Sequence, residues 1–406
     1  MSTGAGTAPA ARPPDYPGLM PFPPLVEPVA ALSESERART VRHASLAGFG
    51  ELGQRRLRAA HVAVIGAGGL GSPVLLALAA AGVGTLTVID DDVVEASNLQ
   101  RQVIHALADV GEAKIDSAAR RIAGLSPETE VRGRKTRIDG TNARELLASV
   151  DLVIDGSDTF DTREAVAAAC ETLGVPLVWG TVQEFAAQVT VFWTEPPAGA
   201  APIRLGDLYP SGSVGFVPTC ADVGVLGALC LQVGGLMAIE AIKLIAGIGE
   251  PLLGRVLVID SLRARQREVP LRPAGAEASA AAAATSPAST NADIAAPLPQ
   301  ISPAELVDAI TAGTAPTMID VREQHELASG TVPGSHHLPL GAVLADPAAF
   351  AESIGGPVIV ICQAGVRATR AARSLAAAGV DAIVLTGGMD AWAETRLAAP
   401  LAEAGA

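Results

Sequence analysis

The chain has 406 residues, of which 49% are hydrophobic and 18% are charged, and its formal net charge is −14. This length is too great for one ordinary hydrophobic core, so we expect two domains, and the negative charge argues against nonspecific binding to nucleic acids or anionic membranes. The four cysteines are widely spaced and form no C-x-x-C pair, which argues against a disulfide scaffold and predicts a reduced, cytoplasmic protein.

The N-terminal residues 1–30 are rich in proline and lack the charged start and apolar core of a signal peptide, so we predict a disordered tail. Residues 31–58 then predict a charged helix, a turn and a second short helix. Arg39 and Arg42 lie in the first of these helices. Without further context, they indicate a solvated face of that helix.

A phosphate-binding turn is predicted in residues 61–71, HVAVIGAGGLG. The apolar residues 62–65 indicate a short strand, the glycine-rich turn follows, and a helix begins at Ser72 with Pro73 in its first turn. Glycines let the backbone approach an oxyanion, and the helix start offers free N–H groups and the positive end of its dipole. We therefore expect a phosphorylated ligand here.

The next strand, at 85–90, ends in Asp90, where an acid suits the two hydroxyls of a ribose. Up to this point an NAD enzyme fits equally well, because a lone G-x-G-x-x-G is weak support for any one nucleotide. The following segment favours a triphosphate, since Arg101 and Lys114 can supply the cations that phosphates under attack require.

The rest of this region continues the α/β pattern. Further strands are expected at 131–137, 151–155, 175–181, 188–193 and 255–260, the last being the final strand, with a helix at 142–149. Asp158 follows the strand at 151–155 in a polar turn, which places it at the same sheet edge as the glycine turn. On local pattern alone, an N-cap for a helix from Asp161 fits equally well.

Residues 223–239 form an apolar run that resembles a membrane span in composition. It contains Gln232, is followed at once by Glu240 and Lys243, and is short for a bilayer. A buried core or interface helix and no membrane association are therefore predicted.

Eight short motifs follow one another along the chain in an order that resembles a known protein family: RxxR, GAGGLG, DDD, SNLQRQ, GxAK, DGSDT, PTCADVGVLG and EAIKLIxGIG. Over residues 31–268 they resemble the MoeB/ThiF family, the ubiquitin-activating-type adenylyltransferases that serve sulfur-carrier proteins. The resemblance implies a Rossmann-like α/β domain, ATP with Mg²⁺, a homodimer, and a small ubiquitin-like sulfur-carrier protein as partner. SNLQRQ and the lysine after it are not features of Rossmann dehydrogenases.

The same resemblance implies the residues of the site. The nucleotide is expected to contact Gly66, Gly68, Gly69, Gly71, Asp90, Asp92, Ser97, Asn98, Arg101, Lys114, Asp158 and Thr159. Gly69 is assigned to the phosphates, Asp90 to the ribose and Asp158 to the metal. Asn98, Arg101 and Lys114 are assigned to the triphosphate and the transition state.

Three features of the resemblance concern other parts of the chain. Arg42 matches an arginine that reaches across a homodimer into the partner's site. Many relatives hold a structural zinc with two C-x-x-C pairs, which this chain lacks, so zinc is expected to be absent. Cys220 lies in a loop that carries a cysteine in such proteins, either as a sulfur or acyl acceptor or as a structural thiol, and both alternatives stay open.

Residues 269–300 are poor in large apolar side chains and predict a flexible linker. A second domain follows over 301–398. Its capping pattern at Ser302 begins a helix, strands are expected at 317–321 and 357–361, and the second of these delivers Cys362.

The loop after Cys362 opens a helix from Ala368. Backbone N–H groups therefore converge on the sulfur, and the helix dipole and Arg367 are expected to lower the pKa of the thiol. With IDVREQHE, GTVPGSHHLP and GGMDAW, the segment resembles a single small α/β rhodanese domain. The resemblance makes Cys362 the persulfide carrier, loaded by thiosulfate or by the persulfide of a cysteine desulfurase. The loop to Arg367 is one residue shorter than in dual-specificity phosphatases, which favours sulfur.

Both halves together predict one reaction sequence. ATP adenylates the C-terminal carboxylate of the carrier, and sulfur from Cys362 then gives a thiocarboxylate, for molybdopterin, thiamine or thiolated-tRNA synthesis. The alternatives are an NAD-linked oxidoreductase with an appended sulfurtransferase, a noncatalytic binding module, and an enzyme that adenylates tRNA bases.

Overall fold

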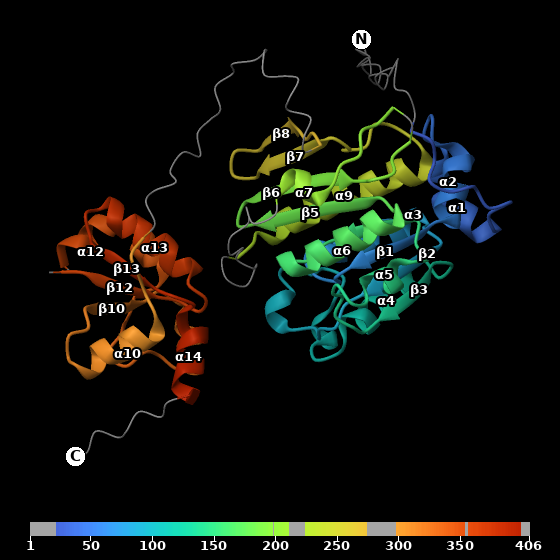
Figure 1. The fold of residues 1–406 in the computed structure, drawn as a ribbon. Coiled ribbons are helices and arrows are strands. Elements are labelled where there is room, and N and C mark those ends of the chain that lie inside the picture. The colour runs from blue at the N-terminus through green and yellow to red at the C-terminus, as the bar shows by residue number, and fades with distance from the viewer. Residues whose placement is uncertain (1–21, 198, 211–223, 274–297, 354–355, 399–406) are drawn as a thin grey trace, which may run out of the picture. The chain divides into compact units, whose positions relative to one another are not determined.

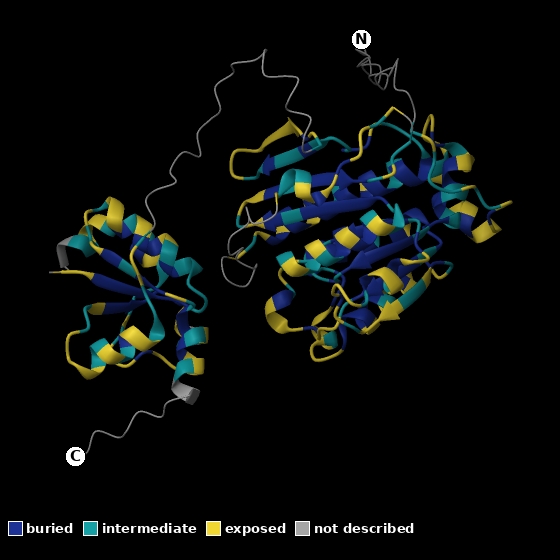
Figure 2. Cartoon of the chain, viewed as in Figure 1, coloured by how far each residue is buried: buried dark blue, intermediate teal, exposed yellow. Residues whose placement is uncertain are grey.

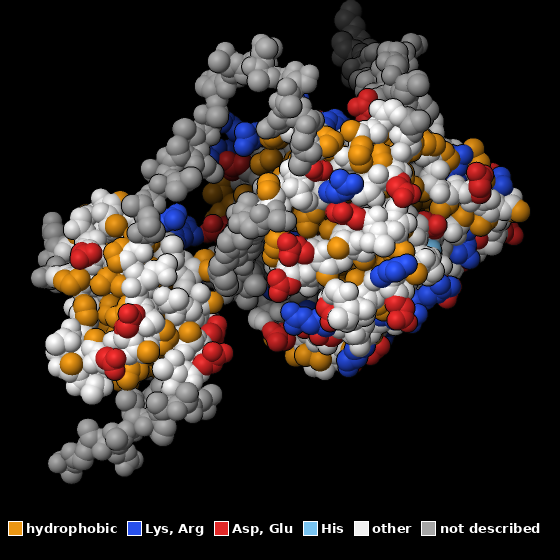
Figure 3. Space-filling model, in the orientation of Figure 1, with side chains coloured by type: hydrophobic (Ala, Val, Ile, Leu, Met, Phe, Trp, Pro, Cys, Tyr) orange, Lys and Arg blue, Asp and Glu red, His pale blue; other side chains and the backbone are white. Residues whose placement is uncertain are grey.

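The computed structural model describes residues 22–197, 199–210, 224–273, 298–353 and 356–398 (Figure 1). These residues form two compact units, an N-terminal one that ends at residue 273 and a C-terminal one that begins at residue 298, and each is described by itself. On the face shown in Figure 3, acidic and basic side chains are interspersed over the N-terminal unit rather than gathered by sign.

The N-terminal unit is built on one eight-stranded sheet. In spatial order its strands are β3 (Glu130–Arg134), β2 (Thr85–Ile89), β1 (His61–Ile65), β4 (Leu152–Asp155), β5 (Leu177–Gln183), β6 (Ala186–Phe192), β7 (Arg255–Asp260) and β8 (Arg265–Pro270). The first five strands in this order pair in parallel and the last three pair antiparallel. The central strands are nearly continuous apolar runs because helices bury both faces of the sheet (Figure 2).

Helices cover the two faces in separate layers. One layer holds α2 (Gly50–Ala59), α3 (Gly71–Ala81), α4 (Lys114–Leu125) and α9 (Gly227–Ala246), with α1 (Glu34–Ala44) packed on α2. The other layer holds α5 (Ala143–Leu147), α6 (Phe160–Leu173) and α7 (Leu205–Leu208). Two single-turn 3₁₀ helices, η1 (Ala96–Asn98) and η2 (Leu107–Asp109), follow β2. This arrangement confirms the predicted Rossmann-like α/β fold.

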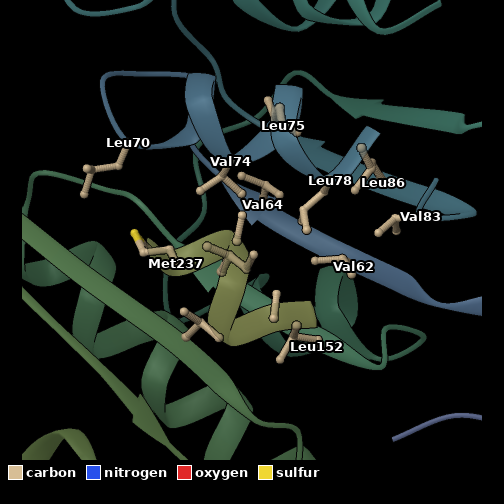
Figure 4. Close-up of a cluster of buried hydrophobic side chains, with 14 of the residues drawn as sticks. Val62, Val64, Leu70, Val74, Leu75, Leu78, Val83, Leu86, Leu152 and Met237 are labelled. Carbon is tan, nitrogen blue, oxygen red and sulfur yellow. The ribbon is translucent and has the colours of Figure 1, made fainter. Parts of the chain in front are cut away.

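Helix α9 lies in the core of this unit, as predicted for the apolar run. In the described part of the chain it alone is long and apolar enough to cross a membrane, yet over half of that segment is buried, and it packs on α2, α3, β5 and β6. A Cβ at Gly234 would lie 2.3 Å from Pro73 Cγ, so a glycine is what lets α9 approach the start of α3. Figure 4 shows Met237 of α9 among side chains from α3 and β1.

The prediction of a disordered tail over residues 1–30 is wrong for its last part. Phe22, Leu25 and Val26 pack against the core, and the Leu25 N–H donates to the carbonyl of Leu244 in α9 at 3.2 Å. Prolines exclude a helix in this segment but do not stop an extended chain from burying the apolar residues between them. Residues 1–21 lie outside the described part.

The prediction that the strand at 255–260 is the last of its domain is also wrong, because β8 follows it. All six residues of β8 are exposed and its sequence, RQREVP, has no apolar alternation. Backbone pairing with β7 forms the strand in place of side-chain burial. The predicted domain end at residue 268 and linker start at 269 therefore fall inside β8.

The C-terminal unit has a five-stranded parallel sheet. In spatial order its strands are β11 (His336–His337), β10 (Thr317–Asp320), β12 (Val358–Ile361), β13 (Ala382–Leu385) and β9 (Gln300–Ile301). One face is covered by α11 (Leu340–Ala345), α12 (Pro347–Ser353) and α13 (Val366–Ala377), and the other by α10 (Pro303–Thr311) and α14 (Gly388–Ala398). The 3₁₀ segment η4 (Gln324–Ser329) follows β10. Helix α10 begins at the predicted cap, where Ser302 Oγ accepts from the Glu305 N–H.

Candidate active sites

The glycine turn joins the carboxyl end of β1 to the start of α3. Gly66 has a φ of +82° and its N–H donates to the Ile89 carbonyl at 2.9 Å. A Cβ on Gly71 would lie 1.8 Å from the Gly66 carbonyl oxygen, so no larger residue fits this crossing. The turn is therefore as tight as a backbone cradle for phosphate requires.

The Ala67 peptide, in the middle of this turn, is held from both sides. Its N–H donates to Asp90 Oδ2 at 2.8 Å, and its carbonyl accepts from His105 Nε2 at 3.0 Å and from Ser72 Oγ at 3.1 Å. The other oxygen of Asp90 accepts from the Asp92 N–H at 2.9 Å. Burial raises the pKa of Asp90 above its usual value, and the nearby Lys114 opposes this shift.

Both predicted cations lie beside the turn. The Cγ and Cδ of Arg101 are 3.6 and 3.5 Å from the position of a Cβ on Gly69, and its Nη1 donates to the Ser97 carbonyl at 3.3 Å. Lys114 begins α4, its side chain is only 7% exposed, and its Nζ donates to Asp92 Oδ2 at 2.7 Å. The Asp92 side chain is 65% exposed, so its ion pair with Lys114 contributes little free energy. Lys114 can therefore exchange Asp92 for another anion at little cost in free energy.

The SNLQRQ segment at 97–102, which contains Arg101, is packed in place. Asn98 in η1 is buried and donates through Nδ2 to Ser97 Oγ at 3.3 Å. A Cβ on Gly227 would lie 2.1 Å from the Gln100 carbonyl, and one on Gly68 would lie 3.7 Å from Gln102 Nε2. The SNLQRQ segment therefore lies between the glycine turn and the start of α9.

The turn after β4 carries Asp158 to the same sheet edge. The Gly156 N–H donates to the Ile65 carbonyl at 3.2 Å, and a Cβ on Gly156 would lie 3.1 Å from the Gly71 nitrogen. Asp158 itself is exposed. The N-cap of α6 is Thr159, whose hydroxyl donates to Thr162 Oγ1 and not to the helix backbone, so Asp158 is not the helix cap.

A buried arginine of α6 holds the turn that follows β4. Arg163 of α6 donates to the Ser157 carbonyl at 2.8 Å and to Thr181 Oγ1 at 3.1 Å, and its guanidinium lies 5.6 Å from the centre of the Trp179 ring. Arg163 and His105 were both missed from the sequence. Each is a single polar or charged residue outside any motif, and contacts such as those of Arg163 with Thr181 and of His105 with Ala67 have no local sequence pattern.

The acidic groups at this edge have the donor chemistry that Mg²⁺ prefers. Asp90, Asp91 and Asp92 form the one cluster of three possible metal ligands found in the described residues, with ligand atoms within 4.8 Å of one another. Asp158 is a single exposed carboxylate near the turn. Mg²⁺ beside a nucleotide commonly uses one or two carboxylates, with phosphates and waters as its other ligands, so Asp158 fits that role.

In the C-terminal unit, Cys362 directly follows β12 and is 1% exposed. The Gly365 N–H donates to its Sγ at 3.0 Å, and Ala364 and Ala368 contribute further backbone hydrogen bonds. The prediction of a lowered thiol pKa is nevertheless wrong. Burial raises the pKa of Cys362 by more than these amides and Arg367 lower it.

The loop around Cys362 is fixed by a buried ion pair. Arg322, with a fully buried side chain, donates to both oxygens of Asp320, at 2.7 Å for the shortest contact, and to Gln363 Oε1 at 3.1 Å. Gln363 Nε2 in turn donates to Asp390 Oδ1 at 2.6 Å. The loop is therefore held from β10 on one side and from α14 on the other.

Comparison with known proteins identifies both units. The sequence model of the ThiF family matches residues 40–280, more than half of the chain. The chain belongs to the ThiF family. The rhodanese-like domain matches residues 302–395, so the C-terminal unit is a rhodanese unit.

One relative covers most of this ThiF-family chain, and other proteins match about 60% of it. It is 42% identical over 380 residues to the probable adenylyltransferase/sulfurtransferase MoeZ of Mycobacterium tuberculosis, covering 92% of this chain and 97% of the relative. It is 44% identical over 241 residues to the sulfur carrier protein adenylyltransferase of Thermus thermophilus, covering 59% and 89%. The crystal structure of Escherichia coli MccB has the same fold, with a TM-score of 0.52 and 21% identity over 60% of this chain and 71% of that one.

The chain is therefore an adenylyltransferase and a sulfurtransferase, and membership of the ThiF family implies that it uses ATP. The NAD-linked oxidoreductase that the glycine turn alone left open is excluded. Two predicted site residues are not placed at the ThiF unit's turn by the described part of the chain. Arg42 is exposed on α1, where a role in a second site requires a second chain, and Cys220 lies outside the described residues.

The raised pKa of Cys362 in the rhodanese unit predicts how its reactivity depends on pH. Because only the thiolate is nucleophilic and its formation is shifted to higher pH, the alkylation rate should rise about tenfold per pH unit between about pH 7 and pH 9. The rate of iodoacetamide labelling of the Cys362 peptide, followed by mass spectrometry, measures this. A rate that levels off below about pH 8.5, the usual pKa of a cysteine thiol, would contradict the direction of the shift.

Proposed function

We propose that this enzyme activates the C-terminal carboxylate of a small ubiquitin-like sulfur-carrier protein with ATP and then converts it to a thiocarboxylate with sulfur from Cys362. The observation that supports this most is the presence in one chain of a phosphate turn flanked by Arg101 and Lys114 and of a persulfide-type cysteine loop. Relatives named for sulfur-carrier adenylation and for SAMP activation support the same assignment.

In the first step, the ATP phosphates bind at the N–H groups of the glycine turn and the ribose binds at Asp90. A carrier carboxylate oxygen attacks the α-phosphorus, the bond to the β-phosphate oxygen breaks, and pyrophosphate leaves. Lys114 leaves Asp92 for the phosphates, and Arg101 lies across Gly69, so both cations stabilise the developing charge. Mg²⁺ held at Asp158 would neutralise further phosphate charge.

In the second step, the terminal sulfur of the Cys362 persulfide attacks the carrier carbonyl carbon. AMP leaves, because it is a far better leaving group than the oxygen of a carboxylate, and an acyl disulfide joins the carrier to Cys362. A second thiolate then attacks Cys362 Sγ, the S–S bond to the carrier's sulfur breaks, and the electron pair leaves with the thiocarboxylate. This step leaves a disulfide between Cys362 and the second thiol, which an external thiol must reduce before the next turnover. Cys220 is our candidate for the second thiol, and an external thiol is the alternative.

The remaining parts of the proposal concern the assembly. We propose a cytoplasmic homodimer in which Arg42 serves the second site, a linker between the two units, and no structural zinc, because the chain lacks C-x-x-C pairs. Exposed apolar side chains on and next to α1, Val41 at 51% and Leu46 at 54%, are compatible with a partner at this surface.

Mass spectrometry of candidate carriers tests the function. The carriers are incubated with enzyme, ATP, Mg²⁺ and saturating thiosulfate. The expected product is a carrier in which sulfur replaces one carboxyl oxygen, formed only when ATP is present. ATP–pyrophosphate exchange should likewise depend on the carrier. Absence of both with every candidate carrier, while nucleotide binds, would overturn the proposal.

A further inference from the structure

The one arginine of the Cys362 loop is occupied by a carboxylate. Arg367 Nη1 and Nη2 donate to Glu326 Oε2 and Oε1 at 2.5 and 2.7 Å, in a bidentate pair between the start of α13 and η4. The two side chains are only 11% and 22% exposed. The sequence does not predict this role of Glu326, because 41 residues separate it from Arg367.

The ion pair between Arg367 and Glu326 is held in a fixed geometry. Glu326 Oε2 also accepts from the Glu323 N–H at 2.8 Å, so η4 holds the carboxylate in position even before Arg367 binds it. The hydrogen bond from Arg367 lowers the pKa of Glu326, which is therefore ionised at neutral pH. A bidentate, partly buried pair of this kind is stronger than an exposed ion pair. An anion that needs Arg367 must therefore compete with Glu326.

In the described residues, the other arginine that contacts the loop is already paired with a carboxylate. Arg322 is neutralised by the buried Asp320, and the third carboxylate, Asp390, binds the loop residue Gln363. The two arginines and three carboxylates in these contacts have a formal sum of −1, although Asp390 is exposed. With Arg367 neutralised by Glu326, thiosulfate, which has two negative charges, gains less from this loop than it would from an unpaired arginine.

We propose that Glu326 makes the rhodanese unit selective against anionic sulfane donors, so that Cys362 is loaded by the persulfide of a protein thiol and thiosulfate is a poor donor. This deepens the proposed function and rests on Cys362 being its sulfur carrier. In either case the Cys362 thiolate attacks the outer sulfur of the donor and becomes a persulfide. The donor's S–S bond breaks, and the electron pair leaves with sulfite from thiosulfate or with the thiolate of the donor protein.

A charge series of donors tests this selectivity in the full-length enzyme. Thiosulfate carries two negative charges and methanethiosulfonate carries one, and both deliver the same sulfane sulfur, with sulfite and methanesulfinate as leaving groups. In Glu326→Gln we expect kcat/KM for thiosulfate to rise about tenfold and that for methanethiosulfonate about threefold, because the Coulomb energy is proportional to the donor charge. Added salt should reduce both gains. Loading from a persulfidated cysteine desulfurase should change less than about twofold.

Two controls separate this effect from general changes. Asp308→Asn removes an exposed carboxylate from α10, so it matches the charge change and should leave both donors unaffected. In an Arg367→Gln background the gain from Glu326→Gln should shrink, because the carboxylate acts by occupying that arginine. Equal gains for the two donors, or none in a variant with unchanged Tm, would overturn the selectivity. If no donor forms a Cys362 persulfide in the wild type, the proposed function itself fails.

Discussion

Replacing Cys362 by serine is expected to abolish sulfur transfer while leaving adenylation intact. Serine is nearly isosteric, so it fits the buried position where the Gly365 N–H donates, but its hydroxyl neither ionises at neutral pH nor carries a sulfane sulfur. Thiocarboxylate formation should fall at least about 10³-fold. Carrier-dependent ATP–pyrophosphate exchange should stay within about twofold of wild type, since it uses the other unit. Mass spectrometry of the carrier and the exchange assay measure the two quantities separately.

A matched control for this prediction is Cys170→Ala. Cys170 is also buried, and burial raises its pKa, but it packs among apolar side chains of α6. Its loss removes a thiol without touching the rhodanese unit, so both activities should be retained. Thiocarboxylate formation that persists in Cys362→Ser would show that another thiol, with Cys220 the first candidate, receives sulfur directly.

The elements that the sequence predicts well are those whose signal is local. The strands β1, β4 and β12 are short apolar runs that end at or next to a glycine, an aspartate or a cysteine at the sheet edge. The apolar run therefore predicts each strand, and the residue type that follows predicts where it ends. The exposed strand β8 has no such pattern, because its order comes from pairing with β7. Leu25 is likewise held by α9, more than 200 residues away in the chain, and the ring of Phe22 lies 6.3 Å from that of Trp193.

The same distinction applies to the candidate sites. Arg101 and Lys114 occur in short motifs at fixed spacing from the glycine turn, so their positions could be predicted. His105 and Glu326 act on residues 38 and 41 positions away, and no local pattern indicates such contacts. The pKa of Cys362 shows a further limit. The sequence reveals the amides and the arginine that lower it, but not the burial that outweighs them.

Replacing Lys114 by alanine should lower kcat/KM for carrier adenylation by about 10²–10³, or about 2.7–4 kcal/mol of transition-state stabilisation. Lys114 is fixed at the start of α4, and its exposed partner Asp92 is easily exchanged for phosphate, so the charge is already in place when the pyrophosphate leaves. Arg101 remains on Gly69 in the variant, which is why some activity should survive. ATP–pyrophosphate exchange followed over a series of carrier concentrations measures the loss.

Two further variants decide whether that loss comes from charge at this position. Lys114→Arg keeps the cation but changes its shape, so it should recover about a tenth or more of the lost rate if electrostatics dominate. Lys135→Ala removes the same charge from an exposed position after β3 and should change the rate less than about twofold. Lys114 is nearly buried, so replacing it by alanine removes the free-energy cost of desolvating its ammonium group. This gain offsets the lost ion pair with Asp92, and we expect little change in Tm. Wild-type exchange in Lys114→Ala would therefore mean that the phosphates do not bind beside Asp92, and that the nucleotide lies elsewhere along the sheet edge.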